Sequence, residues 1–269
     1  MTVRTKICAG VAALALAGAS SVAALRADPV HAHAYGMVVA QQHDHGAAPA
    51  ADEAKPELAP DVEFALWISQ VRGHLLIGND LVKEKQWKAA YPHFQHPIEE
   101  LYKVIEPRLA TYQTPPFDTA LKALSDAVKA RKQADYDAAW KAVSDALARA
   151  DAGLKAKQTN FETFMVTAAV ETLKTSTEEY ESALEKGRIS KPVEYQDARG
   201  YIWQSERMIE SIAPALEQKN AEALKQIRAG YADLKKTFPT AVPPKKPIKD
   251  LDTMKEQVFR IVAAAGKLM

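Results

Sequence analysis

Two histidines and two glutamates lie within eight residues of one another in the stretch Tyr91–Arg108, which reads YPHFQHPIEELYKVIEPR. A further histidine precedes this stretch on what the sequence predicts to be the neighbouring helix. Imidazole is a borderline ligand and carboxylate a hard one, a combination that suits copper, zinc, nickel or iron. We therefore predict a metal site outside the cytoplasm, formed by His74, His93, His96 and Glu100.

Helical geometry is the reason for grouping these four residues. On one continuous α-helix each residue advances by about 100°, which places His93, His96 and Glu100 along one edge. If the chain reverses at Lys85, His74 and His96 are equally far from the turn and reach the same level of an antiparallel hairpin. Bundle interiors lined by histidines and glutamates hold such ions in other proteins.

The same residues also allow a structure without metal. Pro97 is favourable in the first turn of a helix, where His96 would be the capping residue and the glutamates after it would face the positive end of the helix dipole. His93 and His96 would then be partly exposed, and His74 would be a core histidine bonded to a backbone carbonyl.

Carboxylate pairs in the second half of the chain form another candidate site. Glu171 and Glu178 are seven residues apart, and Glu194 and Asp197 are three apart. Such pairs could bind a hard cation such as Fe³⁺ or Ca²⁺, although most of them are solvated surface. Asp197 and the nearby Arg199 could instead hold one helix against another.

The N-terminal residues predict export. Arg4 and Lys6 precede an uncharged, alanine-rich run from residue 7 to residue 25, which is typical of a signal peptide. Cleavage could follow Ala24, Ala34 or Ala40, and we take residues 1–34 as the signal. The predicted location is the periplasm, with no segment spanning the membrane after cleavage.

Residues 35–60 predict a disordered linker, because they are rich in Ala, Pro, Asp and Glu and contain almost no large apolar residue. Two of its histidines, His43 and His45, are candidates for labile metal capture. Cleavage after Ala40 would also create a start at Gln41 from which amine, amides and His43 could chelate Cu(II) or Ni(II).

Composition excludes several functions. The only cysteine, Cys8, lies within the signal, which leaves no disulfide, no attachment site for haem c and no thiolates for an iron–sulfur cluster. The 35 basic and 34 acidic residues are balanced and form no basic block with aromatics, which argues against a nucleic-acid partner. Neither a nucleophile elbow, a phosphate loop nor a zinc-protease motif occurs, which argues against hydrolase and nucleotide chemistry.

The fold class that the sequence predicts is all-α. From Asp61, a predicted N-cap, apolar residues recur at spacings of three and four, and strand-like alternation is absent. Prolines at 115 and 116 and again between 239 and 247 separate the helices. A weak repeat pairs LVKEKQW from Leu81 with LEKGRI from Leu184. We predict two related up-and-down antiparallel bundle modules, residues 61–156 and 157–269, with about eight helices in all.

The stretch EEYESALEKGRISKPVEYQDARGY and the later FPTAVPP, between residues 178 and 244, resemble the extracytoplasmic helical domain that accompanies some bacterial high-affinity iron permeases. They are also similar to other periplasmic helical metal-uptake proteins. The most specific part is VEYQDARGY, Val193–Tyr201. The resemblance implies a periplasmic role beside iron acquisition. The permeases have a membrane bundle after this domain, whereas this chain has only one amphipathic helix after Pro247, so the role would be accessory.

From these observations we predict a soluble periplasmic protein that binds iron or copper, with zinc as a further candidate. It would buffer the ion or deliver it to a membrane metal transporter. The alternative is a metal-free helical module that binds a partner protein. A third hypothesis is an oxidase-like bundle with a dinuclear carboxylate site, but the paired Glu-x-x-His segments of such proteins are missing.

Overall fold

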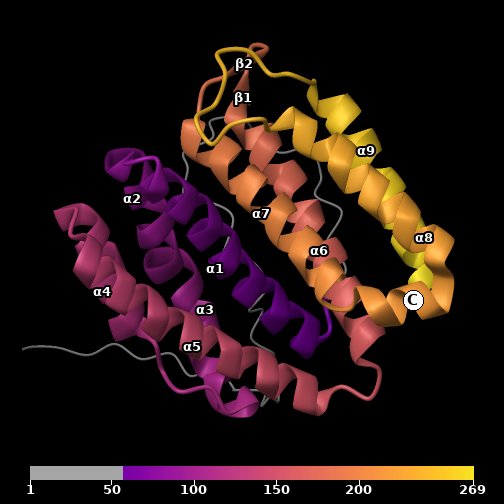
Figure 1. Ribbon diagram of the computed structural model, residues 1–269, viewed down its shortest axis with the longest axis horizontal. Helices are drawn as coiled ribbons and strands as arrows, with labels where there is room; N and C mark the ends of the chain where they lie inside the picture. Colours follow the sequence, from indigo (N-terminus) through magenta and orange to yellow (C-terminus); the bar gives the residue numbers. More distant parts are fainter. Residues whose placement is uncertain (1–56) are drawn as a thin grey trace, which may run out of the picture. The chain divides into compact units, whose positions relative to one another are not determined.

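The computed structural model describes residues 57–269, in which helix α1 (Pro60–Lys83) is surrounded by other helices (Figure 1). Its buried positions run consecutively from Trp67 to Val71 instead of forming one stripe. A helix that is buried on every side lies in the interior of a bundle. The helix begins with Pro60 in its first turn and no side-chain cap, so the prediction of Asp61 as the N-cap was wrong.

Helix α2 (Trp87–His96) returns antiparallel to α1 after a tight turn. Lys85 has a positive φ of 59°, which confirms the predicted reversal at this residue. The chain then continues as a π-helical turn, η1 (Pro97–Leu101), a short helix α3 (Tyr102–Ile105) and a 3-10 segment η2 (Glu106–Tyr112). Pro97 therefore does not begin a new α-helix, and the residues before it and after it do not share one α-helical period.

Helices α4 (Asp118–Ala130) and α5 (Gln133–Lys157) form a hairpin that covers one side of α1 and α2 (Figure 1). The predicted break at Pro115 and Pro116 is confirmed, because both prolines lie between η2 and α4.

Helices α6 (Phe161–Ala183) and α7 (Pro192–Ser211) pack on one another, and α7 packs against α1. A two-stranded antiparallel hairpin, β1 (Leu184–Glu185) and β2 (Arg188–Ile189), connects them. The sequence pattern predicted no strand in this region. The turn residues Lys186 and Gly187 both have positive φ, the conformation that joins antiparallel strands through two residues.

Helices α8 (Ala213–Leu234) and α9 (Leu251–Ala265) complete the bundle, with short 3-10 turns η3 (Lys235–Thr237) and η4 (Gly266–Leu268) after them. A loop containing four prolines separates η3 from α9, and Asp250 caps α9 by accepting a hydrogen bond from the Thr253 amide at 2.8 Å.

The all-α fold class is confirmed. Within residues 57–269 none of the helices combines the length and the apolar composition needed to cross a bilayer. The division into two modules stays a prediction.

Candidate metal centre

Three side chains from three helices meet in the interior where α1, α2 and α7 pack together. They are His74 of α1, His93 of α2 and Asp197 of α7, and each offers one ligand atom that lies within 4.8 Å of the other two. All three are buried: the side chain of His74 is 4 % exposed, that of His93 is 0 % exposed and that of Asp197 is 5 % exposed. The antiparallel α1–α2 hairpin supplies both imidazoles, whereas the carboxylate comes from a helix about a hundred residues further along the chain.

One carboxylate oxygen faces both imidazoles. Asp197 Oδ1 lies 2.7 Å from Nδ1 of His74 and 2.9 Å from Nδ1 of His93. The second oxygen, Oδ2, lies 3.8 Å from Nδ1 of His96, whose side chain is 19 % exposed. The His74 and His96 rings are 5.5 Å apart between centroids, as expected for residues at the same level of a hairpin.

The far side of each buried imidazole also has a partner. His93 Nε2 lies 3.0 Å from Oε1 of Gln196, and His74 Nε2 lies 2.9 Å from the Tyr201 hydroxyl. Both partners belong to α7, like Asp197. Consequently side chains of α7 lie close to both ring nitrogens of His93 and of His74.

The geometry around His74 differs from that around His93 in one respect. His93 Nδ1 and Asp197 Oδ1 lie 2.9 Å apart in hydrogen-bonding geometry, whereas His74 Nδ1 lies closer to the same oxygen but is not aligned for a hydrogen bond. His74 Nδ1 is thus a buried polar atom without a hydrogen-bond partner. Such atoms are rare, and they indicate a bound ion, a water molecule or a functional constraint.

Glu100 lies outside the group of three. It is exposed, and the chain reaches it through the π-helical turn, in which the Tyr102 amide bonds to the Pro97 carbonyl five residues back. The expectation that His93 and Glu100 lie on one continuous α-helix was therefore wrong. The metal-free interpretation expected a partly exposed His93, which is instead fully buried, and a core His74, which is buried as expected but bonds to the Tyr201 hydroxyl instead of a backbone carbonyl. His96 has helical backbone angles instead of those of a cap.

The buried charge of Asp197 is compensated by its neighbours. Burial alone would raise the pKa of the Asp197 carboxyl, but the adjacent His74 and His93 hold it well below its usual range. Burial lowers the pKa of His96, and the neighbouring His74 lowers it further. The shift of Asp197 favours its ionised carboxylate, which is the form that binds metal, and the shift of His96 favours the neutral form of that imidazole.

A second layer of carboxylates lies near the group. Burial, followed by the charges of Asp197 and Glu194, raises the pKa of Glu179 well above its usual value. Burial raises the pKa of the Tyr201 hydroxyl as well, and the nearby Glu179 has the same effect. The region is therefore rich in negative potential, and Tyr201 is a neutral phenol.

The spacing between the carboxylate oxygen and each imidazole nitrogen is that of neighbouring ligands of one transition-metal ion. Two ligands at about 2.1 Å from one ion and at right angles to each other are about 3.0 Å apart. The distances from Asp197 Oδ1 to the two imidazoles, 2.7 Å and 2.9 Å, are close to this spacing. Two histidines and one carboxylate with free positions are the ligand set of non-haem Fe(II) sites, and the same donors serve zinc.

Of the other carboxylates that the sequence suggested, Asp197 groups with two histidines, and Glu171 bonds to Lys174 at 2.7 Å on the surface. Arg199 pairs with Asp80 of α1 at 2.9 Å, which supports the expectation that this part of α7 holds two helices together. His43 and His45 lie outside the described residues.

Sequence reasoning missed Asp197 and Gln196 as partners of the histidines. The available signal was a run of polar residues, Glu194, Gln196 and Asp197, within a helix whose neighbours are small or apolar. All three are buried in the structure. Three polar residues within four positions near the start of a buried helix were therefore a signal for this site.

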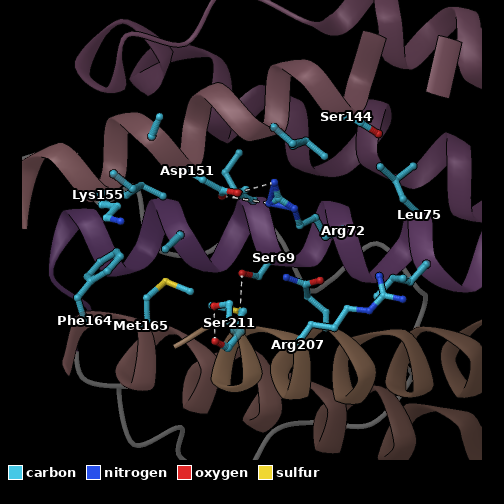
Figure 2. Close-up of a pocket in the computed structure, with 18 of the residues that line it drawn as sticks. Ser69, Arg72, Leu75, Ser144, Asp151, Lys155, Phe164, Met165, Arg207 and Ser211 are labelled. Carbon is cyan, nitrogen blue, oxygen red and sulfur yellow. Dashed lines mark hydrogen bonds and ion pairs between the residues drawn. The ribbon is translucent and has the colours of Figure 1, made fainter. Parts of the chain in front are cut away.

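A pocket of about 550 Å³ lies between α1, α5, α6 and α7 and is separate from the metal centre (Figure 2). Its walls are mostly apolar, and Arg72 crosses it to bind both carboxylate oxygens of Asp151. None of the three candidate ligands lines it.

Comparisons with known proteins give one match. No curated protein and no solved structure matches the chain. The family match covers the end of α5 and all of the helices from α6 to α9. Residues 155–269 are identified as an iron permease-associated 4-helix bundle domain.

Proposed function

We propose that this protein is an exported metal-binding protein that holds iron or copper at His74, His93 and Asp197 and buffers the ion or delivers it to a membrane uptake partner. The metal is cargo in this account. The observation that carries the proposal is the convergence of two buried imidazole nitrogens on one buried carboxylate oxygen, at the spacing of neighbouring ligands of one ion.

Among the metals, the donor set favours ferrous iron. The three residues supply nitrogen and oxygen donors and no sulfur, and soft ligands are what copper(I) prefers. Three protein ligands leave further coordination positions open to water or to a receiving protein. An open site suits an ion that has to be released.

The family match supports the iron context, because residues 155–269 belong to a domain named for its association with iron permeases. That region contains Asp197, Gln196 and Tyr201, whereas His74 and His93 precede it. We infer that the helices before the matched domain complete a metal site on it. The predicted signal peptide supports a periplasmic location, where a membrane transporter would be the recipient.

Metal analysis of the full chain purified from the periplasm tests the proposal. Wild-type protein loaded with Fe²⁺ under anaerobic conditions should hold one ion per chain after desalting. The Asp197→Asn and His93→Ala variants should hold less than a tenth of that amount. Asp151→Asn removes an exposed carboxylate that pairs with Arg72, and it serves as the control that keeps full occupancy.

Three outcomes would contradict the proposal. They are wild-type protein that retains no ion, Asp197→Asn protein that retains as much as wild type, and equal loss in the Asp151→Asn control. Parallel loading with Cu²⁺ and Zn²⁺ decides which metal the site prefers.

A metal-free interaction module is the second candidate, and one observation favours it. Val242 and Ile248 are 50 % and 54 % exposed in the loop before α9, beside Lys245 and Lys246. Exposed apolar residues in a basic loop are suited to a partner protein. If this candidate is correct, Val242→Ser and Ile248→Ser should abolish capture of a membrane partner, and Asp197→Asn should leave it unchanged.

A further inference from the structure

Gln196 contacts Nε2 of His93, the ring nitrogen on the opposite side from the contact with Asp197. Its side-chain nitrogen donates to the carbonyl oxygen of Ala241 at 3.0 Å, in the loop before α9. A backbone carbonyl can only accept, so this bond fixes the orientation of the Gln196 amide. The amide oxygen is thereby turned toward His93 Nε2, at a distance of 3.0 Å.

The orientation of the amide constrains the proton on His93. An amide oxygen accepts hydrogen bonds and cannot donate, so Nε2 of His93 must carry a hydrogen. The remaining nitrogen, Nδ1, then faces Asp197 Oδ1 at 2.9 Å. Two lone pairs at this distance repel one another unless a positive charge, a proton or a metal ion, lies between them.

We propose that Gln196 is a positioning residue of the metal site: it holds the hydrogen of His93 on Nε2 and thereby reserves Nδ1 for the ion shared with Asp197. This inference rests on the proposed function. Ligating histidines commonly donate their other ring N–H to an oxygen acceptor, which fixes the tautomer and raises the basicity of the ligand. Gln196 supplies that acceptor at a fully buried imidazole.

Three variants separate this role from a structural one. Gln196→Leu removes the acceptor, and Gln196→Glu keeps an acceptor for His93 Nε2 but cannot donate to Ala241. Tyr195→Phe is the matched control, because the Tyr195 hydroxyl donates to the Thr240 carbonyl of the same loop at 3.3 Å without touching a histidine.

Zinc is the probe, since it is diamagnetic and fits the same donors. Competition with a chromogenic chelator should show Zn²⁺ affinity reduced by about 10- to 100-fold in Gln196→Leu, the usual cost of losing such a partner. Gln196→Glu should bind within about threefold of wild type, and so should Tyr195→Phe. Affinity lost equally in Leu and Glu variants would mean that Gln196 acts through the loop and would overturn the proposal.

The ring nitrogens give a second readout that does not depend on metal affinity. In protein labelled with ¹⁵N-histidine, NMR should show His93 Nε2 bonded to hydrogen in both the metal-free and the zinc-loaded wild type. In Gln196→Leu this proton should exchange rapidly or move to Nδ1. A wild-type His93 without a hydrogen on Nε2, or zinc bound through Nε2, overturns the proposal. If the wild type binds no zinc but Nε2 keeps its proton, the proposed function fails and the positioning of His93 by Gln196 stands.

Discussion

Gly200 of α7 crosses Gly73 of α1 with no room for a side-chain carbon between the two backbones. A Cβ atom at Gly200 would overlap with the carbonyl group of Gly73, and one at Gly73 would overlap with the ring of Tyr201. The residue after Gly73 is His74, and Asp197 lies one helical turn before Gly200. This close approach of the two helices is what brings the imidazole and the carboxylate together.

Gly200→Ala should therefore weaken both the fold and the metal site. Inserting a methyl group between packed backbones costs about 1–3 kcal/mol of unfolding free energy. We expect this loss in urea denaturation of the metal-free protein, together with reduced ion occupancy. Gly266→Ala is the control, since a Cβ atom at Gly266 meets nothing within 4 Å. Wild-type stability and occupancy in Gly200→Ala would show that the helices can separate without affecting the site.

Asp197→Asn should destabilise the protein even without metal. The carboxylate is buried between two imidazoles, and removing one partner of a buried charged pair costs about 3–5 kcal/mol. Thermal or urea unfolding in the presence of a chelator measures the effect. In contrast, loss of the exposed Arg72–Asp151 pair in Asp151→Asn should cost at most about 1 kcal/mol. Equal effects of the two substitutions would mean that Asp197 is not held in a buried pair.

Glu179→Gln should stabilise the metal-free protein at neutral pH. Burial and the neighbouring carboxylates raise the pKa of Glu179 in the folded state, so the folded protein holds this proton more tightly than the unfolded chain does. The free energy of unfolding therefore decreases as the pH rises above about 4.3, which is the pKa of a glutamate in the unfolded chain. It stays at the lower value once the pH exceeds the pKa of Glu179 in the folded protein.

The glutamine removes that cost, so Glu179→Gln should be more stable than wild type at pH 7, and the gain should vanish near pH 4. Urea unfolding of both proteins at the two pH values measures it. Glu217→Gln, at an exposed position of α8, is the control that should show no gain at either pH. A destabilised Glu179→Gln protein at pH 7 would contradict the assigned direction.

His96 and Glu100 should contribute less to metal binding than the three buried residues. His96 Nδ1 is 3.8 Å from Asp197 Oδ2 and partly exposed, and Glu100 is exposed. We expect His96→Ala to weaken Zn²⁺ binding by less than about tenfold and Glu100→Gln to change it by less than about threefold. Titration against a competing chelator measures both. A larger loss in Glu100→Gln than in His93→Ala would restore the site that the sequence alone predicted.

The sequence predicted the two helices that carry the histidines, but it did not predict that α7 brings a carboxylate to them. The turn at Lys85 and the helical periodicity place His74 and His96 at one level, because these are local properties of a hairpin. Asp197 joins them through the crossing of α7 over α1, which depends on packing between residues far apart in the chain. Glu100 does not continue the α-helical period of His93, because a π-helical turn begins at Pro97.

Anomalous diffraction from crystals of the full chain grown anaerobically with Fe²⁺ tests the central claim most directly. The account predicts one strong iron peak at bonding distance from Nδ1 of His74, Nδ1 of His93 and Oδ1 of Asp197. No peak among these atoms, or a peak only at other residues, would contradict it.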